Sequence, residues 1–313
     1  MKLRNDFKKI LKSNAHYYGL TINKDDEIDD LMFKIINYKE SIFTKSSYHL
    51  NYSKHFLKQL ENLPKKYNDY LDNILNMLKN GDLNVNKFLT KQIKTTSFYD
   101  DFRILWGLYH LHIEKLIKGK AFSERSNYLL ILYKNNSNIY LVDIVEHREP
   151  DLWYKKRFLE IIDNEWSDLL PVLQGTSGSD YNEKDIKLYR NSNINTVINV
   201  NGKAVMSTIN GISTNGTPFQ YVRESLYMKI TLEKIEKYFQ IDTAIYPHKF
   251  FYTFIKHENK NFYVTKNNGV SKQILIISLL EDSSYIKEIK INFDNDYLSM
   301  LFDNTISYVE KLF

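Results

Sequence analysis

The hydrophobic pattern of this chain changes period near residue 105, and this change constrains the fold more than any other feature. Before that point, apolar residues recur at the three-to-four-residue spacing of amphipathic helices. Residues 53–62 and 65–80 predict two helices joined at Leu63-Pro64. The second ends at Asn80-Gly81, a common helix stop. We therefore expect a helical hairpin in this part of the chain.

After residue 105 the apolar residues alternate or form short continuous runs, which is the pattern of strands. Three strands are predicted, over residues 105–114, 128–133 and 139–146. The last two are separated by the polar residues 134–138, a hairpin length, so we expect them to pair antiparallel. A helical hairpin followed by an antiparallel sheet belongs to the α+β class.

Further elements flank this region on both sides. Helical spacing recurs in residues 4–14, 26–38 and 152–164, and the glycine- and serine-rich segment 171–180 is typical of a linker. Beyond it we expect helices over 183–190, 230–239 and 296–312, strands over 250–256, 261–266 and 273–280, and Asn-Gly turns at 201–202, 210–211 and 215–216. Three regions follow: a helical N-terminal element over residues 1–45, an α+β domain over residues 46–170, and a second α+β domain rich in β-hairpins over residues 171–313.

The composition removes several kinds of chemistry. None of the 313 residues is cysteine, which excludes disulfides, thiolate metal sites, iron–sulfur clusters and cysteine nucleophiles. The N-terminus shows no apolar run of signal-peptide length, and no apolar stretch approaches the ~20 residues that a membrane span needs. We therefore expect a cytoplasmic protein without membrane contact.

Positive charge is concentrated in the first half of the chain. Residues 1–164 hold 27 Lys and Arg against 21 Asp and Glu, whereas residues 165–313 hold 16 against 17. Within the first half, residues 45–134 hold 15 basic against 8 acidic residues. A modestly basic face of this kind suits a polyphosphate partner such as RNA. The alternative is a set of solvated lysines on helix surfaces.

The densest group of titratable residues lies in the predicted sheet. Because side chains alternate along a strand, His110, His112 and Glu114 share one face, and Tyr109 lies on the other. A third histidine, His147, follows the last predicted strand. We expect the three histidines to line one cleft. Histidines grouped in this way serve either as an acid–base pair or as metal ligands.

The order of a helical hairpin, antiparallel strands and a last strand ending in His147-Arg148-Glu149 resembles the RelE/ParE superfamily of bacterial toxins, over about residues 53–162. Residues 139–148 match the terminal-strand pattern of that family, which has basic residues where His147 and Arg148 stand. The chain departs from the family in its added regions and in the pair His110 and His112. Paired histidines are a feature of the wider group of RNase toxins that includes EndoU-like enzymes.

This resemblance implies a toxin-like ribonuclease that needs no metal or other cofactor, acting in toxin–antitoxin or antiviral defence. Acid–base catalysis falls to His110, His112 and His147, and the phosphate is stabilised by Arg125, Arg148 or Lys120. Unpaired bases can stack on Tyr109, Trp153 or Tyr154. Such an enzyme requires an antitoxin, a trigger protein or its own C-terminal half to restrain it.

Two other classes of function remain open from the sequence. His110, His112 and His147, with Glu114 or Asp143, can also be a divalent-metal site, since imidazole and carboxylate suit Zn²⁺, Fe²⁺ or Mn²⁺. The third class is a module that binds nucleic acid or a protein without catalysis. The sequence alone identifies neither the RNA substrate nor the oligomeric state.

Overall fold

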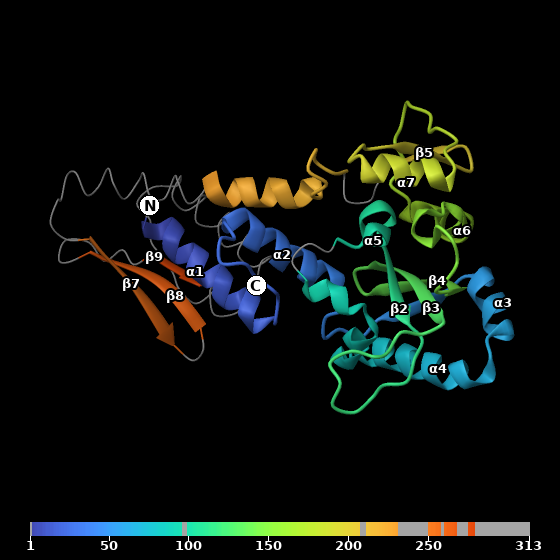
Figure 1. The fold of residues 1–313 in the computed structure, drawn as a ribbon, viewed down its shortest axis with the longest axis horizontal. Helices are drawn as coiled ribbons and strands as arrows, with labels where there is room; N and C mark the ends of the chain where they lie inside the picture. Colours follow the sequence, from blue (N-terminus) through green and yellow to red (C-terminus); the bar gives the residue numbers. More distant parts are fainter. Residues whose placement is uncertain are drawn as a thin grey trace. The chain divides into compact units, whose positions relative to one another are not determined.

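The computed structural model describes residues 2–95, 99–206 and 211–230, and the backbone of residues 250–257, 260–267 and 275–278. The chain has an α+β fold and divides into two compact units. One unit comprises residues 37–220, and the other comprises residues 1–36 and 221–313 (Figure 1).

A four-stranded mixed sheet is the centre of the first unit. Its strands are β1 (His49–Tyr52), β2 (Leu108–His112), β3 (Tyr128–Asn135) and β4 (Asn138–Glu146), in the order β1-β4-β3-β2. β3 pairs antiparallel with both β2 and β4, as expected, whereas β1 pairs parallel with β4. The sequence pattern does not predict β1, because its four residues are too short a run to show a period.

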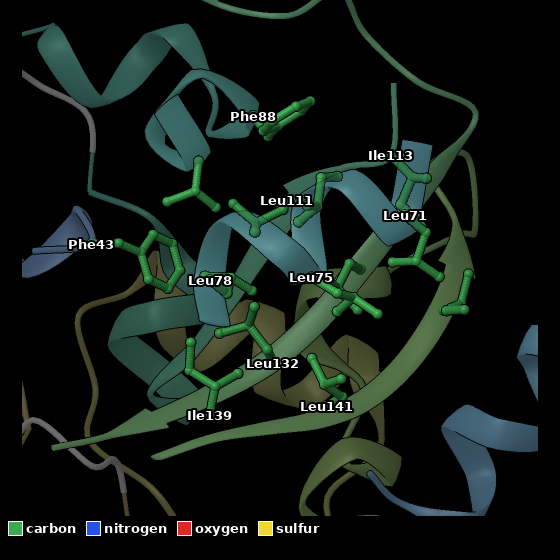
Figure 2. Close-up of a cluster of buried hydrophobic side chains, with 14 of the residues drawn as sticks. Phe43, Leu71, Leu75, Leu78, Phe88, Leu111, Ile113, Leu132, Ile139 and Leu141 are labelled. Atoms are coloured by element: carbon green, nitrogen blue, oxygen red, sulfur yellow. The ribbon is translucent and has the colours of Figure 1, made fainter. Parts of the chain in front are cut away.

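The predicted helical hairpin covers one face of this sheet. It consists of α3 (Lys54–Asn62) and α4 (Lys65–Asn80), followed by the short 3₁₀ helices η1 (Leu83–Phe88) and η2 (Lys91–Lys94). Ser53 caps α3 by accepting from the Phe56 amide, and its hydroxyl donates to the carbonyl of Val142, each at 2.8 Å. Side chains from both helices and from the sheet form one buried cluster (Figure 2), which includes Phe43, Leu71, Leu75, Leu78, Phe88, Leu111, Ile113, Leu132, Ile139 and Leu141.

The other face of the sheet packs against α5 (Asp101–Trp106), η3 (Leu152–Tyr154), α6 (Arg157–Trp166) and η4 (Ser167–Leu169). The prediction of a strand starting at residue 105 is wrong, because α5 occupies residues 101–106. The chain then turns at Gly107, whose φ of 68° suits glycine. The helix expected over 152–164 is divided between η3 and α6.

The segment 171–180 is not a free linker. It flanks the hairpin of β5 (Val197–Val200) and β6 (Lys203–Met206), through bridges from Val172 to Val205 and from Ser179 to Ile198. A Cβ on Gly178 would lie 2.2 Å from the carbonyl carbon of Ile198, so only glycine allows this approach. The hairpin and α7 (Glu183–Asn191) share a buried cluster with the central sheet. The structure therefore differs from the expected boundary after residue 170, because both sides contribute to one core.

The second unit contains α1 (Lys2–Tyr17), most of α2 (Ile28–Ser41) and the helical residues 221–230. It also contains the antiparallel strands β7 (Phe250–His257), β8 (Lys260–Asn267) and β9 (Leu275–Ser278), near the strands expected there. Except for residue 230, the helix expected over 230–239 lies outside the described residues, as does the helix expected over 296–312. In the described part of the chain, no helix is long and apolar enough to cross a membrane.

Candidate active site

Three histidine rings meet on the face of the sheet that lies opposite the helical hairpin. His110 and His112 extend from β2, and their ring centroids are 6.1 Å apart. His147 follows β4, and its ring stacks on His112 with a centroid distance of 5.3 Å. The expected convergence of the three histidines is therefore confirmed in the structure. We call His110, His112 and His147 the histidine cluster.

Local hydrogen bonds hold His112 and His147 in place. The amide of Ser126 donates to Nδ1 of His112 at 3.4 Å, and the Ser126 hydroxyl donates to the carbonyl of Ile113 at 2.5 Å. The amide of His147 donates to the carbonyl of Asn127 at 2.8 Å. The segment that leads into β3 therefore ties the end of β2 to the residue that follows β4.

His110 lies in a more enclosed position. The indole ring of Trp153 lies 4.7 Å from its ring centroid, and Phe102 lies 6.5 Å away. Nδ1 of His110 lies 3.3 Å from a carboxylate oxygen of Asp100, the residue that caps α5. The sequence pattern does not single out Asp100, whose one signal is its position as an acidic residue before a short apolar run.

Burial makes the histidines unequal as proton carriers. Burial, and then the neighbouring charges of His110, His147 and Arg125, lower the pKa of His112 from 6.5 to about 3. Burial, with Arg125 next in effect, also lowers the pKa of the half-buried His147. His112 is therefore neutral near pH 7, which favours a role other than general acid for this histidine. His147 is also mainly neutral, and a neutral imidazole can accept a proton.

Two pockets involve the histidine cluster or its neighbours in the chain: His112 lines the first, and Glu146 and Arg148, on either side of His147, line the second. The first, which we call the Arg125 pocket, has a volume of about 230 Å³ and is lined by Leu89, Thr90, Lys91, Gln92, His112, Ser123, Glu124 and Arg125. The second, which we call the Tyr128 pocket, has a volume of about 500 Å³ and is lined by Pro64, Lys66, Tyr67, Asn127, Tyr128, Glu146 and Arg148. Each pocket contributes one arginine whose charge lowers the pKa of His147.

Some predicted site residues lie elsewhere. Tyr109 packs on the opposite face of the sheet, where its hydroxyl donates to the carbonyl of Glu40 at 2.6 Å. Tyr154 is buried, and its hydroxyl donates to Asp101 at 3.1 Å. Tyr109 therefore lies on the other face of the sheet from the histidine cluster, Tyr154 is enclosed in the core, and base stacking by either ring stays a prediction. Lys120 is exposed and pairs with Glu124 at 2.6 Å.

The alternative set of metal ligands does not assemble. The carboxylate of Glu114 accepts from the amide of Lys115 at 2.9 Å, and Asp143 belongs to a different cluster. Among the described residues, no group of three or more His, Asp or Glu side chains is arranged to hold a metal ion. The ligand set predicted from His110, His112, Glu114 and His147 is therefore wrong.

A second ionic cluster surrounds Asp143, at a β-bulge in β4. This buried carboxylate lies 3.3 Å from Nε2 of His55 and 3.5 Å from Arg157, which also pairs with Glu149. Burial raises the pKa of Asp143 to about 6. An aspartate inside the run Val142-Asp143-Ile144-Val145 is the sequence signal for this cluster, whereas its partners His55 and Arg157 come from distant helices.

Comparisons of the chain with protein-family models, with curated proteins and with solved structures gave no match.

Proposed function

We propose that this protein is a metal-independent endoribonuclease whose site is the histidine cluster with Arg125 and Arg148. The observation that carries the proposal is the position of His147. It is a half-buried imidazole with a lowered pKa, it stacks on a second histidine, and two arginines act on it. A neutral base beside two guanidinium groups is what RNA cleavage without a metal requires.

The proposed reaction is an attack within the substrate. His147 takes the proton of a ribose 2′-OH, and the 2′-oxygen forms a bond to the adjacent phosphorus while the bond from phosphorus to the 5′-oxygen breaks. The leaving 5′-oxygen takes a proton from water, and His147 later releases its proton to solvent. The products are a 2′,3′-cyclic phosphate and a 5′-hydroxyl. Arg125 and Arg148 stabilise the negative charge on the phosphate.

In this mechanism, His110 and His112 position His147 and do not transfer protons themselves. His112 supports the ring of His147 from one side. His110 contacts His112 and lies between Asp100 and Trp153. Trp153 is therefore a supporting residue in this proposal, and base stacking falls to other aromatic side chains.

A second candidate is a module that binds RNA without cutting it. The burial of His110 and His112, which are 7% and 6% exposed, favours this reading because buried histidines are commonly structural. Both candidates predict RNA binding that weakens steeply as salt concentration rises. They differ in the need for His147 as a base.

A nuclease assay on the full chain separates the candidates. The ribonuclease proposal predicts cleavage of single-stranded RNA that persists in EDTA and falls about 10²–10⁴-fold in the His147→Asn variant. His49→Asn, which changes an exposed histidine on β1, is the matched control and retains full activity. Cleavage abolished by EDTA would support a metal enzyme, and RNA binding without cleavage would support the binding module.

The proposal extends to the biological setting. A ribonuclease that acts in the cytoplasm damages its own cell unless it is restrained. We propose restraint by an antitoxin, by a trigger protein or by the rest of the chain, in toxin–antitoxin or antiviral defence. The support for this setting is the toxin-like order of elements in residues 53–162.

A further inference from the structure

The Tyr128 pocket lies between the helical hairpin and the start of β3, and two of its lining residues, Glu146 and Arg148, flank His147 in the chain. Tyr128 is half-buried, and its ring packs edge-on against Tyr67 with a centroid distance of 4.8 Å. Tyr67 is only 4% exposed, so it supports Tyr128 from within and Tyr128 presents the accessible ring. The ammonium of Lys66 lies 4.6 Å from the centroid of the Tyr67 ring.

The Tyr128 pocket has side chains of both charges, and Arg148 and Glu146 stand at different positions in it. Arg148 directly follows His147, and its charge lowers the pKa of that histidine. Glu146 is paired with Tyr128 in the register of β3 and β4. A carboxylate beside Tyr128 repels a phosphate, whereas Arg148 attracts one. Lys66 offsets the charge of Glu146 in the part of the pocket at Tyr128, which therefore suits an uncharged group, and the part at Arg148 suits a phosphate.

One short segment of chain connects this pocket to the Arg125 pocket. Arg125 lines one pocket, while Asn127 and Tyr128 line the other. Between them, Asn127 accepts the hydrogen bond from the amide of His147. Three residues of extended chain span at most about 10 Å, so both pockets lie within reach of one short oligonucleotide bound at His147.

We infer that the Tyr128 pocket binds the base of a nucleotide next to the cleaved phosphate of a single-stranded RNA. The base stacks on the ring of Tyr128, Arg148 holds the phosphate between this nucleotide and the one at His147, and the strand continues toward Arg125. Unpaired bases stack on aromatic side chains, and every base presents a π-face, so this subsite accepts single strands of varied sequence. The inference rests on the proposed function for the position of the cleaved phosphate.

The test measures binding without cleavage. A fluorescent 2′-O-methyl RNA hexamer, which has no free 2′-OH, and an abasic hexamer with the same number of phosphates are titrated against the full chain. We expect the hexamer with bases to bind about 5- to 150-fold more tightly, which is the fold-change equivalent of ~1–3 kcal/mol for one stacked base. Equal affinities for the two hexamers would overturn the inference.

Variants of Tyr128 test whether the tighter binding of the hexamer with bases comes from the Tyr128 pocket. We expect Tyr128→Leu to abolish the difference between the two hexamers and Tyr128→Phe to retain it, since only phenylalanine preserves the ring. Tyr52→Leu removes an exposed tyrosine of β1 and is the matched control. A preference that survives Tyr128→Leu would overturn the assignment to this pocket. If Tyr128→Leu does not fold, Tyr128→Phe is compared with Lys66→Glu instead. Lys66→Glu places a second carboxylate in the pocket, so it should weaken the binding of both hexamers.

The outcomes for this subsite and for the proposed reaction are distinguishable. Base-dependent binding through Tyr128 in a chain that never cleaves RNA would retain the subsite and refute the ribonuclease. Cleavage that depends on His147, together with equal binding of the two hexamers, would retain the ribonuclease and refute the subsite.

Discussion

His112 and His147 stack with their ring planes at 25° to each other, although 34 residues of sequence and the whole of β3 lie between them. Two stacked imidazoles at a centroid distance of 5.3 Å cannot both be charged without strong repulsion. Arg125 adds a further positive charge that acts on both rings. The fold therefore keeps this pair neutral, which leaves His147 able to accept a proton.

The first prediction is that His112 makes the protein sensitive to acid. Its pKa is about 3 in the folded state and near 6.5 when unfolded, so between these values the unfolded state binds a proton that the folded state does not. Stability is thus fully present above pH 6.5 and is lost as the pH falls toward 3. We expect the free energy of unfolding of the wild type to fall with a slope of up to ~1.4 kcal/mol per pH unit from this group.

Urea denaturation at a series of pH values, with the wild type and His112→Gln compared, checks this prediction. The variant should lose less stability on acidification because it has no imidazole to protonate. His16→Gln, which changes a histidine at the end of α1, serves as the control. Parallel pH profiles for the wild type and His112→Gln would contradict the lowered pKa.

The histidine cluster was predictable because it depends on a local rule. Alternation along β2 places His110 and His112 on one face whatever surrounds them, and the hairpin of β3 and β4 follows from its turn length. Asp100 and His55 could not be predicted in the same way. Their positions depend on how α5 and α3 pack on the sheet, and this information is distributed over many distant residues.

The segment 171–180 shows how composition can mislead. Its glycine and serine residues are typical of linkers, but Gly178 is required by a close approach to the backbone of β5. Composition alone cannot distinguish a glycine that gives flexibility from one that permits contact. The strand β1 joins the sheet by pairing with the backbone of β4, and its side chains show no periodic pattern that predicts a strand.

The second prediction concerns Asp143 and has the opposite sign. Its pKa is raised from 3.8 to about 6, so the folded state holds a proton more tightly than the unfolded state does. The stability from this group is present below about pH 4 and is lost as the pH rises through 6. Relative to the wild type, Asp143→Asn should therefore become more stable as the pH rises from 4 to 7.

The same denaturation series measures this difference. Asp163→Asn is a useful control, because Asp163 is a buried aspartate that pairs with Lys203 and with none of the partners of Asp143 named above. A stability difference between Asp143→Asn and the wild type that stays constant with pH would show that His55 and Arg157 offset the cost of burial.

The third prediction tests the coupling between Arg125 and His147. Removing the guanidinium in Arg125→Ala removes one cause of the lowered pKa, so the pKa of His147 should rise. If His147 is the base, the acid limb of the profile of log(kcat/KM) against pH should move to higher pH. Lys118→Ala, which removes an exposed cation from the same loop, should leave that limb in place. An unchanged limb in Arg125→Ala would exclude His147 as the group that titrates.

The fourth prediction concerns Gly178. In Gly178→Ala the added methyl group meets the backbone of Ile198 at 2.2 Å, so the segment must move away from β5. We expect a loss of about 1–3 kcal/mol in the free energy of unfolding, typical of overpacking. Ser177→Ala tests a neighbouring exposed position and should change stability by no more than about 0.5 kcal/mol. Equal stabilities for the two variants would mean that the segment 171–180 is a flexible linker and does not pack against β5.

The last prediction concerns toxicity and follows from the proposed reaction. Induced expression of the wild-type chain should slow the growth of a bacterial host, at least when a trigger is present, because an active ribonuclease depletes cellular RNA. His147→Asn should relieve the growth defect. The change is at a half-buried site outside the core, so the loss of stability should be about 1 kcal/mol, whereas the loss of a general base costs about 10²–10⁴-fold in rate.

The comparison needs equal amounts of folded protein. Expression levels and thermal melting of the wild type, His147→Asn and the control His49→Asn establish this, and growth is then followed for all three. Relief by His147→Asn alone is the expected result, because the charges of both arginines that would hold the phosphate act on His147, whereas His49 lies on β1. If His147→Asn folds normally and slows growth as much as the wild type does, then His147 is not the base. In that case the binding module becomes the better account of the histidine cluster.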